Sequence, residues 1–273
     1  MHREALQSTP RPAVSSPPFN RRWSLALPLL ALALALGLTL TDCNIATFRA
    51  LQSVSMEWPN LVWHVITWLG DTQLCLALLA TAALPRHPRW LMAMVWAALP
   101  ATLFVHGIKA SLPTARPLGV LGSDGVHVIG AALYHGSFPS GHTATAFVVA
   151  GCVVLSLAPA QRARWALPVI ALATLVGLSR IAVGAHWPVD VLVGAAGGWA
   201  CAALGVWTAG RWPVGQTGRG LRVLGVLAIA LGVSLWLRPL AEPEAWLARL
   251  LGTGAVIAGA LAWHRPRLRE VQA

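Results

Sequence analysis

The chain has 273 residues, of which 56% are hydrophobic and only 11% are charged, and 20 Lys and Arg against 9 Asp and Glu give a formal net charge of +11. Typical soluble domains carry about 25% charged residues, so this composition excludes an ordinary soluble enzyme, a disordered chain and a small disulfide scaffold. A strong positive charge usually indicates nucleic acid or an anionic membrane surface. Here the basic residues are scattered singly or in pairs between long apolar runs, which argues against a nucleic-acid partner.

The N-terminal segment, residues 1–23, is predicted to be a disordered cytoplasmic tail, because Met1–Asn20 is rich in Pro, Ser and Thr. Arg21 and Arg22 precede the first apolar run, an arrangement also found in cleaved signal peptides. The long lead and the lack of a small-x-small cleavage site favour a retained membrane span instead.

Eight apolar segments follow, and they are predicted to be membrane spans. An α-helix needs about 20 residues to cross a bilayer, and several of these segments are shorter, so flanking residues must contribute. A soluble protein of buried helices would need polar faces on some of them, and these segments have almost none. The predicted spans are Leu25–Leu40, Leu61–Leu84, Trp90–Gly107, His142–Ala158, Leu167–Val183, Val189–Gly210, Val223–Leu237 and Trp246–Trp263.

The connections between these spans differ in character. Thr41–Asn60 is predicted to be an outer loop that contains an interfacial helix. Lys109–Gly141 is the longest internal connection, and it is rich in Gly and lacks apolar periodicity. Long loops in compact proteins are usually functional or disordered.

The basic residues predict the orientation of the chain. With the N-terminus in the cytoplasm, every predicted inner segment carries at least two Arg, as the positive-inside rule requires. The inner set is Arg3, Arg11, Arg21, Arg22, Arg86, Arg89, Arg162, Arg164, Arg211, Arg219, Arg222, Arg265, Arg267 and Arg269. The outer set is Arg49, Lys109, Arg116, Arg180, Arg238 and Arg249.

The four cysteines, Cys43, Cys75, Cys152 and Cys201, are far apart in the sequence and have no metal-binding spacing such as C-x-x-C. We therefore expect small buried apolar residues rather than a metal site.

Three clusters of polar residues fall at one predicted membrane boundary. The first is Lys109-x6-Arg116-Pro117, the second is Pro139-Ser140-Gly141-His142, and the third is Ser179-Arg180-x5-His186-x3-Asp190. The topology thus brings three cations, two histidines and one carboxylate to the same side.

These residue types suit phosphoryl transfer. Lys109, Arg116 and Arg180 can bind phosphate oxygens, and a helix that begins at Ser140 and Gly141 favours anions at its N-terminus. Asp190 follows His186 by four residues, so both can lie on one helix face. A carboxylate bound to one imidazole nitrogen leaves the other free as a nucleophile, and His142 is a second imidazole that can act as an acid.

The three motifs, in this order and without a departure, resemble the type 2 phosphatidic acid phosphatase (PAP2) and haloperoxidase superfamily, in its membrane lipid phosphatase branch. The resemblance covers about Asp42 to Gly210, including Gly70-Asp71. It implies an all-α polytopic membrane helix bundle, with a six-helix core over residues 24–210. Two additional transmembrane helices over 211–263 and a cytoplasmic basic tail over 264–273 would lie outside this core.

The resemblance also implies the role of each site residue. His186 would attack phosphorus and form a phosphohistidine, Asp190 would orient it, and His142 would protonate the leaving oxygen. The phosphoryl oxygens would be held by Lys109, Arg116, Ser140, Gly141 and Arg180. No metal or other cofactor is expected, because the cations supply the charge stabilisation.

Several polar residues have plainer interpretations. Arg49, Arg238 and Arg249 are expected to anchor helices at the membrane interface. His106 is expected to be a satisfied buried histidine, or to lie behind the site, and His127 and His135 are expected to be ordinary surface residues. For Asp71 the sequence leaves open a place beside the site or a helix cap.

The predicted function is an integral-membrane phosphatase of the bacterial inner membrane, with cytoplasmic termini and an active site that faces the periplasm. Its partners would be the bilayer and a lipid substrate, with no nucleic acid, and the oligomeric state is left open. The preferred substrates are undecaprenyl diphosphate or phosphatidate, and the alternatives are lipid A or phosphatidylglycerophosphate. Two other classes remain in view: a vanadate-dependent haloperoxidase, disfavoured by the many spans, and a non-enzymatic phospholipid-binding or transport protein.

Overall fold

The computed structural model describes residues 21–214, 217–240 and 244–270, and these residues are almost entirely helical. The helices are α1 (Arg21–Leu40), α2 (Asn44–Ser55), α3 (Asn60–Trp68), α4 (Thr72–Ala83), α5 (Pro88–Ser111), α6 (Pro117–Leu121), α7 (Gly141–Ser156), α8 (Pro159–Ala182), α9 (Pro188–Arg211), α10 (Gly218–Leu237) and α11 (Glu244–Glu270), with a short 3-10 helix, η1 (Ser123–Gly125). An all-α fold follows from the apolar composition, because a chain in lipid must satisfy its backbone hydrogen bonds internally.

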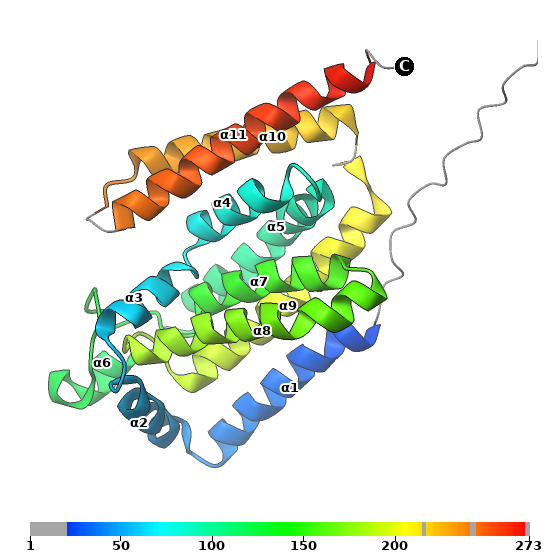
Figure 1. The fold of residues 1–273 in the computed structure, drawn as a ribbon. Helices are drawn as coiled ribbons and strands as arrows, with labels where there is room; N and C mark the ends of the chain where they lie inside the picture. Colours follow the sequence, from blue (N-terminus) through cyan, green and yellow to red (C-terminus); the bar gives the residue numbers. More distant parts are fainter. Residues whose placement is uncertain (1–20, 215–216, 241–243, 271–273) are drawn as a thin grey trace, which may run out of the picture.

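The long helices run along a common direction and form a membrane bundle (Figure 1). Six of them, α1, α5, α8, α9, α10 and α11, are long and apolar enough to cross a bilayer, and the bent pair α3 and α4 adds a seventh span if it counts as one. The prediction of eight spans is thus wrong by this measure, although each of the eight predicted segments is helical.

The difference between eight predicted spans and seven is due to α7. Its 16 residues extend about 24 Å at 1.5 Å per residue, less than the roughly 30 Å of a bilayer core. Eleven of them are buried, and α7 packs against α5, α8 and α9. The predicted fourth span is therefore a short helix in the centre of the bundle.

The close contact between α7 and α9 depends on two glycines in α9. A Cβ on Gly194 would lie 2.6 Å from the carbonyl oxygen of Ser140, and one on Gly198 would lie 2.3 Å from that of Ala144. Small residues let membrane helices approach closely, since association in lipid depends on packing. This crossing brings the start of α7 next to the start of α9.

The far end of α7 is held by a buried arginine. Arg162, near the start of α8, donates hydrogen bonds to the carbonyl oxygens of Val154, Leu155 and Leu157 at 3.1, 3.2 and 2.8 Å. These carbonyls belong to the last turn of α7 and the residue after it, where an α-helix leaves its acceptors unpaired. Arg162 therefore joins α7 to α8, a role beyond the topology signal expected from the sequence.

The predicted second span is broken. The α3 and α4 axes differ by 67°, and the break falls at Leu69, Gly70 and Asp71. Asp71 caps α4, because its Oδ1 accepts hydrogen bonds from the N–H groups of Gln73 and Leu74 at 3.0 and 3.2 Å. An apolar run alone predicted one continuous segment here.

Two connections contain more structure than a loop. The segment 41–60 holds α2, so the expected helix is present, and α2 packs on α8 and α9 through the buried Phe48. The long connection after α5 contains α6 and η1.

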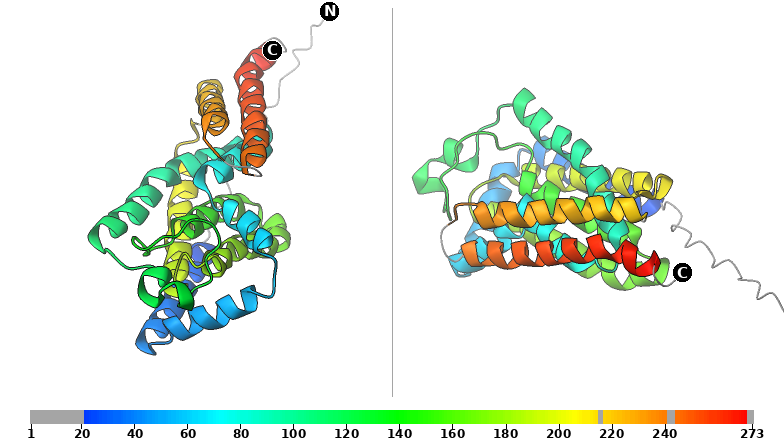
Figure 2. Two further views of the ribbon diagram at one scale, coloured as in Figure 1. Left: turned by 90° about the vertical axis from the view of Figure 1, so that its left-hand side faces the viewer. Right: turned by 90° about the horizontal axis from the view of Figure 1, so that it is seen from above.

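The last two helices, α10 and α11, lie side by side and pack on the rest of the protein mainly through α4 (Figure 2). The start of α1 and the end of α11 lie at one end of the bundle, while α2, α3 and α6 gather at the other (Figure 1). The helix α1 begins at Arg21, inside the predicted tail of residues 1–23, and α11 continues to Glu270, through most of the predicted tail of 264–273. Residues 1–20 and 271–273 lie outside the described residues.

Candidate active site

The three sequence motifs come from different helix ends, and the structure brings them together at the end of the bundle that holds α2, α3 and α6. The first motif spans the last turn of α5 and the residue before α6, the second starts α7, and the third joins α8 to α9. The geometry around His186 shows how they meet.

His186 is almost completely buried, with 2% of its surface exposed. Its Nδ1 lies 3.4 Å from Oδ2 of Asp190, and its Nε2 lies 3.5 Å from a terminal guanidinium nitrogen of Arg116. One ring nitrogen therefore faces a carboxylate and the other faces a cation.

The turn that presents His186 depends on a glycine. Gly184 has φ of +73°, a conformation that L side chains avoid. The N–H groups of Ala185 and His186 both donate to the carbonyl oxygen of Arg180, at 3.0 and 3.1 Å. This turn at the end of α8 places His186 two residues before Pro188, which starts α9.

Asp190 is fixed by two further donors. The hydroxyl of Ser137 donates to its Oδ2 at 2.5 Å, and the backbone N–H of Trp187 donates to the same oxygen at 2.9 Å. Ser137 is fully buried. Ser137 could not be singled out from the sequence, because it lies two residues before the second motif and follows no spacing rule.

Arg116 links the segment between α5 and α7 to the turn before His186. It donates to the carbonyl oxygens of His135 at 2.8 Å, Ala185 at 2.9 Å and Gly136 at 3.3 Å. Three acceptors fix the plane of the guanidinium group. Lys109 donates to the carbonyl oxygen of Gly136 as well, so both cations of the first motif hold the same segment.

Arg180 is the most buried of the three cations, with 7% of its surface exposed. It donates to the hydroxyl of Thr67 in α3, whereas its Nε is buried and, among the described residues, has no hydrogen-bond partner. A buried donor without an acceptor is costly, and a phosphate oxygen would satisfy it. Thr67 is a second contact that the sequence did not indicate.

The second motif starts α7. Ser140 is fully buried, and its hydroxyl caps the helix by accepting hydrogen bonds from the N–H and hydroxyl of Thr143 at 3.4 and 2.8 Å. The next residues, Gly141 and His142, occupy the open N-terminal turn, whose N–H groups lack partners within the helix. His142 lies within electrostatic reach of Arg180, His186 and Arg116.

The surroundings of His186 hold its pKa well below the usual histidine value. Burial is the main cause, and the positive charges of Arg180, Arg116 and Lys109 add to it. Burial also lowers the pKa of Arg116, with Asp190 acting in the opposite direction. His186 is therefore neutral at pH 7, as a nucleophile must be.

The remaining candidates are placed as follows. His106 is exposed, so the expectation of a buried histidine is wrong. His135 is exposed as expected, and His127 is half-buried, with its Nε2 2.9 Å from Oδ1 of Asn60. Asp71 caps α4, and it also forms an ion pair with Arg238 at 2.9 Å. Arg238 is thus bound within the protein and is more than an interface anchor.

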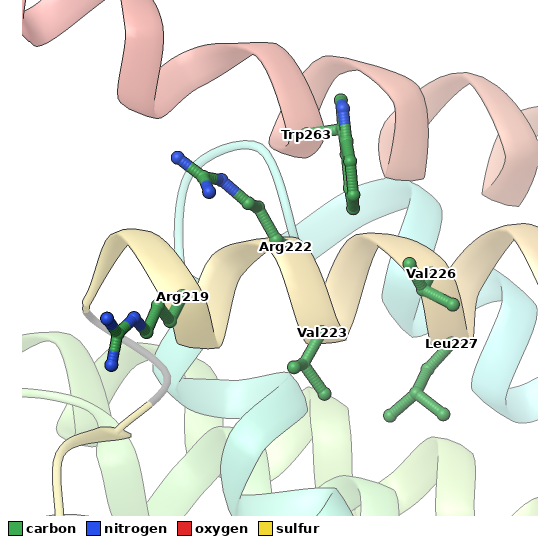
Figure 3. Close-up of a pocket in the computed structure, with 6 residues that line it drawn as sticks. All are labelled: Arg219, Arg222, Val223, Val226, Leu227 and Trp263. Atoms are coloured by element: carbon green, nitrogen blue, oxygen red, sulfur yellow. The ribbon is translucent and has the colours of Figure 1, made fainter.

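No group of three or more His, Cys, Asp or Glu suitable for a metal ion occurs within residues 21–214, 217–240 and 244–270. An open apolar pocket lies between α10 and α11 (Figure 3), and its walls are Arg219, Arg222, Val223, Val226, Leu227 and Trp263. These residues start α10 and lie near the end of α11, so this pocket contains no residue of the three motifs.

Comparisons with known proteins agree with the motifs. Residues 90–213 match the PAP2 superfamily. A stretch of 72 residues is 43% identical to the lipid A 1-phosphatase of Porphyromonas gingivalis, and it covers 26% of this chain but only 16% of that relative.

Two crystal structures are similar. Aquifex aeolicus LpxE superimposes with a TM-score of 0.51 and 26% identity, covering 60% of this chain and 94% of that one. The first transmembrane PAP2 type phosphatidylglycerolphosphate phosphatase from Bacillus subtilis gives a TM-score of 0.47 and 22% identity, with coverage of 72% and 98%. With the three motifs gathered on the helical bundle and the family match over residues 90–213, this part of the chain is a PAP2 superfamily domain.

Proposed function

We propose that this integral membrane protein is a lipid phosphatase that works through a covalent phosphohistidine at His186, without a metal ion. The observation that carries the proposal is the state of His186: a buried, neutral imidazole between the carboxylate of Asp190 and the cation of Arg116. Such a group can attack a phosphorus atom that the neighbouring cations hold in place.

In the first step, Nδ1–H of His186 donates to Asp190, and the lone pair on Nε2 attacks phosphorus. The bond from phosphorus to the lipid oxygen breaks, and His142, which takes up a proton when the negatively charged phosphate binds beside it, donates that proton to the lipid oxygen. Asp190 stabilises the positive charge that develops on His186. Because Ser137 and Trp187 fix the carboxylate, little reorganisation is needed during the reaction.

The equatorial phosphoryl oxygens would be bound by Lys109, Arg116, Arg180 and the start of α7 at Ser140 and Gly141. The buried and unpaired Nε of Arg180 supports this assignment. In the second step, His142, now neutral, takes a proton from water as the water attacks phosphorus. The P–N bond breaks, inorganic phosphate leaves, and His186 is regenerated.

For the substrate we propose a phosphorylated glycolipid of the lipid A 1-phosphate type. The local 43% identity to a lipid A 1-phosphatase supports this choice. It favours the alternative from the sequence over the initial preference for undecaprenyl diphosphate or phosphatidate. Phosphatidylglycerophosphate, the other alternative from the sequence, is the second candidate.

We further propose that the site faces the periplasm and that the residue 24–210 core carries the reaction, with 211–263 as two added spans. The basic turns lie at the end of the bundle opposite the three motifs. The turn before α5, with Arg86 and Arg89, is an example. The positive-inside rule places these turns in the cytoplasm. The bacterial inner membrane is the expected location.

The decisive test uses full-length protein purified in detergent. Wild-type protein should release inorganic phosphate from a lipid A 1-phosphate, with the release continuing in EDTA, and His186→Ala should abolish it because the nucleophile is gone. His106→Ala is the matched control, since His106 is exposed and lies outside the site. Undiminished turnover by His186→Ala would overturn the assignment.

A substrate panel separates the remaining possibilities. Equal amounts of lipid A, prenyl diphosphate, phosphatidate and phosphatidylglycerophosphate should show the highest kcat/KM for lipid A. A non-enzymatic binding protein would release no phosphate from any of them. Addition of vanadate, peroxide and halide would reveal a haloperoxidase, which the many membrane spans disfavour.

A further inference from the structure

The two C-terminal helices lie outside the family match, yet they contact the wall of the site. The match ends at residue 213, whereas α10 begins at Gly218 and packs on α4. Arg238 follows the last residue of α10 directly. The side chain of Arg238 contacts residues at the break between α3 and α4.

On one side, this break borders the candidate active site. A Cβ on Gly70 would lie 2.9 Å from Cβ of His142 and 2.7 Å from Cγ1 of Val176, so the bare backbone of the break packs directly against the His142 side chain. One turn earlier, the hydroxyl of Thr67 accepts a hydrogen bond from Arg180. A shift of the break would therefore move His142 or its support.

On the other side, Arg238 holds the same break. It donates to Oδ2 of Asp71 at 2.9 Å and to Oε1 of Gln73 at 3.2 Å, and its guanidinium carbon lies 6.0 Å from the ring centre of Trp68. Oδ1 of Asp71 is already used to cap α4. Both carboxylate oxygens thus hold the break, one toward α4 and one toward α10.

Two further contacts strengthen this junction. His64 in α3 contacts the carboxylate of Glu244 at the start of α11, and Gln73 donates to the hydroxyl of Ser234 in α10 at 3.4 Å. The end of α10 and the start of α11 therefore both contact the α3 and α4 pair. Exposed ion pairs contribute little, but the side chains of Asp71 and Arg238 are only 18% and 33% exposed.

From these contacts we propose that Arg238 is a positioning residue for catalysis, which holds the Leu69–Asp71 break against His142 through its ion pair with Asp71. In this way α10 and α11 help to hold His142, the proposed proton donor, in position. This inference rests on the proposed function, in which His142 protonates the leaving oxygen.

The test compares two substrates in the full-length protein. Arg238→Gln should lower kcat for the lipid substrate by roughly ten- to hundredfold, the scale at which misplacement of a catalytic group acts. Hydrolysis of p-nitrophenyl phosphate should change much less, because its leaving group needs little protonation. Arg238→Lys should restore much of the lipid activity, and Arg219→Gln, at the other end of α10, is the matched control.

A mutant cycle gives a second measurement on the lipid substrate alone. Asp71→Asn keeps one oxygen to cap α4 and loses the oxygen to which Arg238 donates. It should therefore cost about as much as Arg238→Gln, and the double variant should cost no more than either single variant.

Several outcomes would overturn the inference. They are wild-type lipid turnover by Arg238→Gln, an equal loss on both substrates, or additive losses in the cycle. The first two leave the proposed function intact, provided that His186→Ala remains inactive on both substrates. Lipid phosphatase activity that persists in His186→Ala would instead remove the proposed function itself.

Discussion

At the scale of single residues, His186 is subject to opposing effects. The cations that would bind phosphate also keep the imidazole neutral, since each positive neighbour disfavours its protonation. Asp190, in contrast, lies 3.4 Å from Nδ1 of the ring and, in the proposed mechanism, would stabilise the charge that forms there. In that mechanism the same cations would act twice, first on the resting imidazole and then on the substrate.

This coupling predicts a change in pH dependence. The neutral form of His186 is lost as the pH falls through its pKa, which lies well below the usual histidine value. Arg116→Gln removes one of the lowering charges, so the pKa should rise and the acid limb of kcat/KM should move to higher pH by about one unit. The profile of kcat/KM, which reports the free enzyme, measures this shift.

Arg116→Lys is the control, because it keeps the charge while losing the planar contacts to the carbonyl oxygens of His135, Ala185 and Gly136. Its acid limb should stay near the wild-type position even if the rate falls. An acid limb that stays in place in Arg116→Gln would show that the charge of Arg116 does not set the protonation of His186.

The sequence predicted the residues of the motifs better than their partners. Lys109, Arg116 and His186 could be grouped because their motifs fall at one membrane boundary. Ser137 and Thr67 could not, because a buried serine or threonine in an apolar chain has many possible partners, and only the packing of distant helices selects one.

At the scale of elements, α7 is the helix on which the site depends. It lies between α5, α8 and α9, its start carries the second motif, and its end is capped by Arg162. Because it is short and mostly buried, its position is set by protein contacts more than by the lipid.

A larger residue at the α7 and α9 crossing should therefore destabilise the protein. In Gly198→Ala the new Cβ would lie 2.3 Å from the carbonyl oxygen of Ala144, and backbone must move. Overpacking of this kind costs about 1–3 kcal/mol. Thermal unfolding in detergent should show a lower midpoint, together with reduced phosphatase activity as α7 shifts.

Gly37→Ala in α1 is the matched control, since nothing lies within 4 Å of the added Cβ. It replaces a glycine within a helix and should be neutral or slightly stabilising. Equal midpoints for the two variants would contradict a tight crossing at Gly198.

The hydrophobic pattern predicted where helices occur, but not how they pack in the bundle. It led to α7 being predicted as a span, because an apolar helix has the same composition whether lipid or protein surrounds it. It also joined α3 to α4, although Gly70 and Asp71 marked a possible helix start. The bend depends on α8 and on the α10 and α11 pair, which are distant in sequence.

At the scale of the whole molecule, the net charge of +11 combines two separate roles. Most basic residues flank the helix ends opposite the site, and a smaller group surrounds His186. Arg162 and Arg238 show that some cations also hold helices together. A total charge alone could not separate these roles, whereas sorting the charges by membrane side did so in part.

The predicted orientation can be tested with the native cysteines. Cys43 is exposed, between α1 and α2 at the end of the bundle that holds the site, and Cys75, Cys152 and Cys201 are buried. If this end faces the periplasm, a membrane-impermeant maleimide should label Cys43 in right-side-out vesicles. Mass spectrometry of the labelled peptide gives the readout.

The opposite end supplies the comparison. Trp212, the residue after α9, is 52% exposed, so Cys43→Ser combined with Trp212→Cys offers one accessible thiol at the other end of the bundle. This thiol should react only after the vesicles are permeabilised. Because Cys43 and Trp212 lie at opposite ends of the bundle, the two labelling patterns together fix the orientation. Labelling of Trp212→Cys in sealed vesicles, with Cys43 protected, would invert the proposed topology and place the phosphatase site in the cytoplasm.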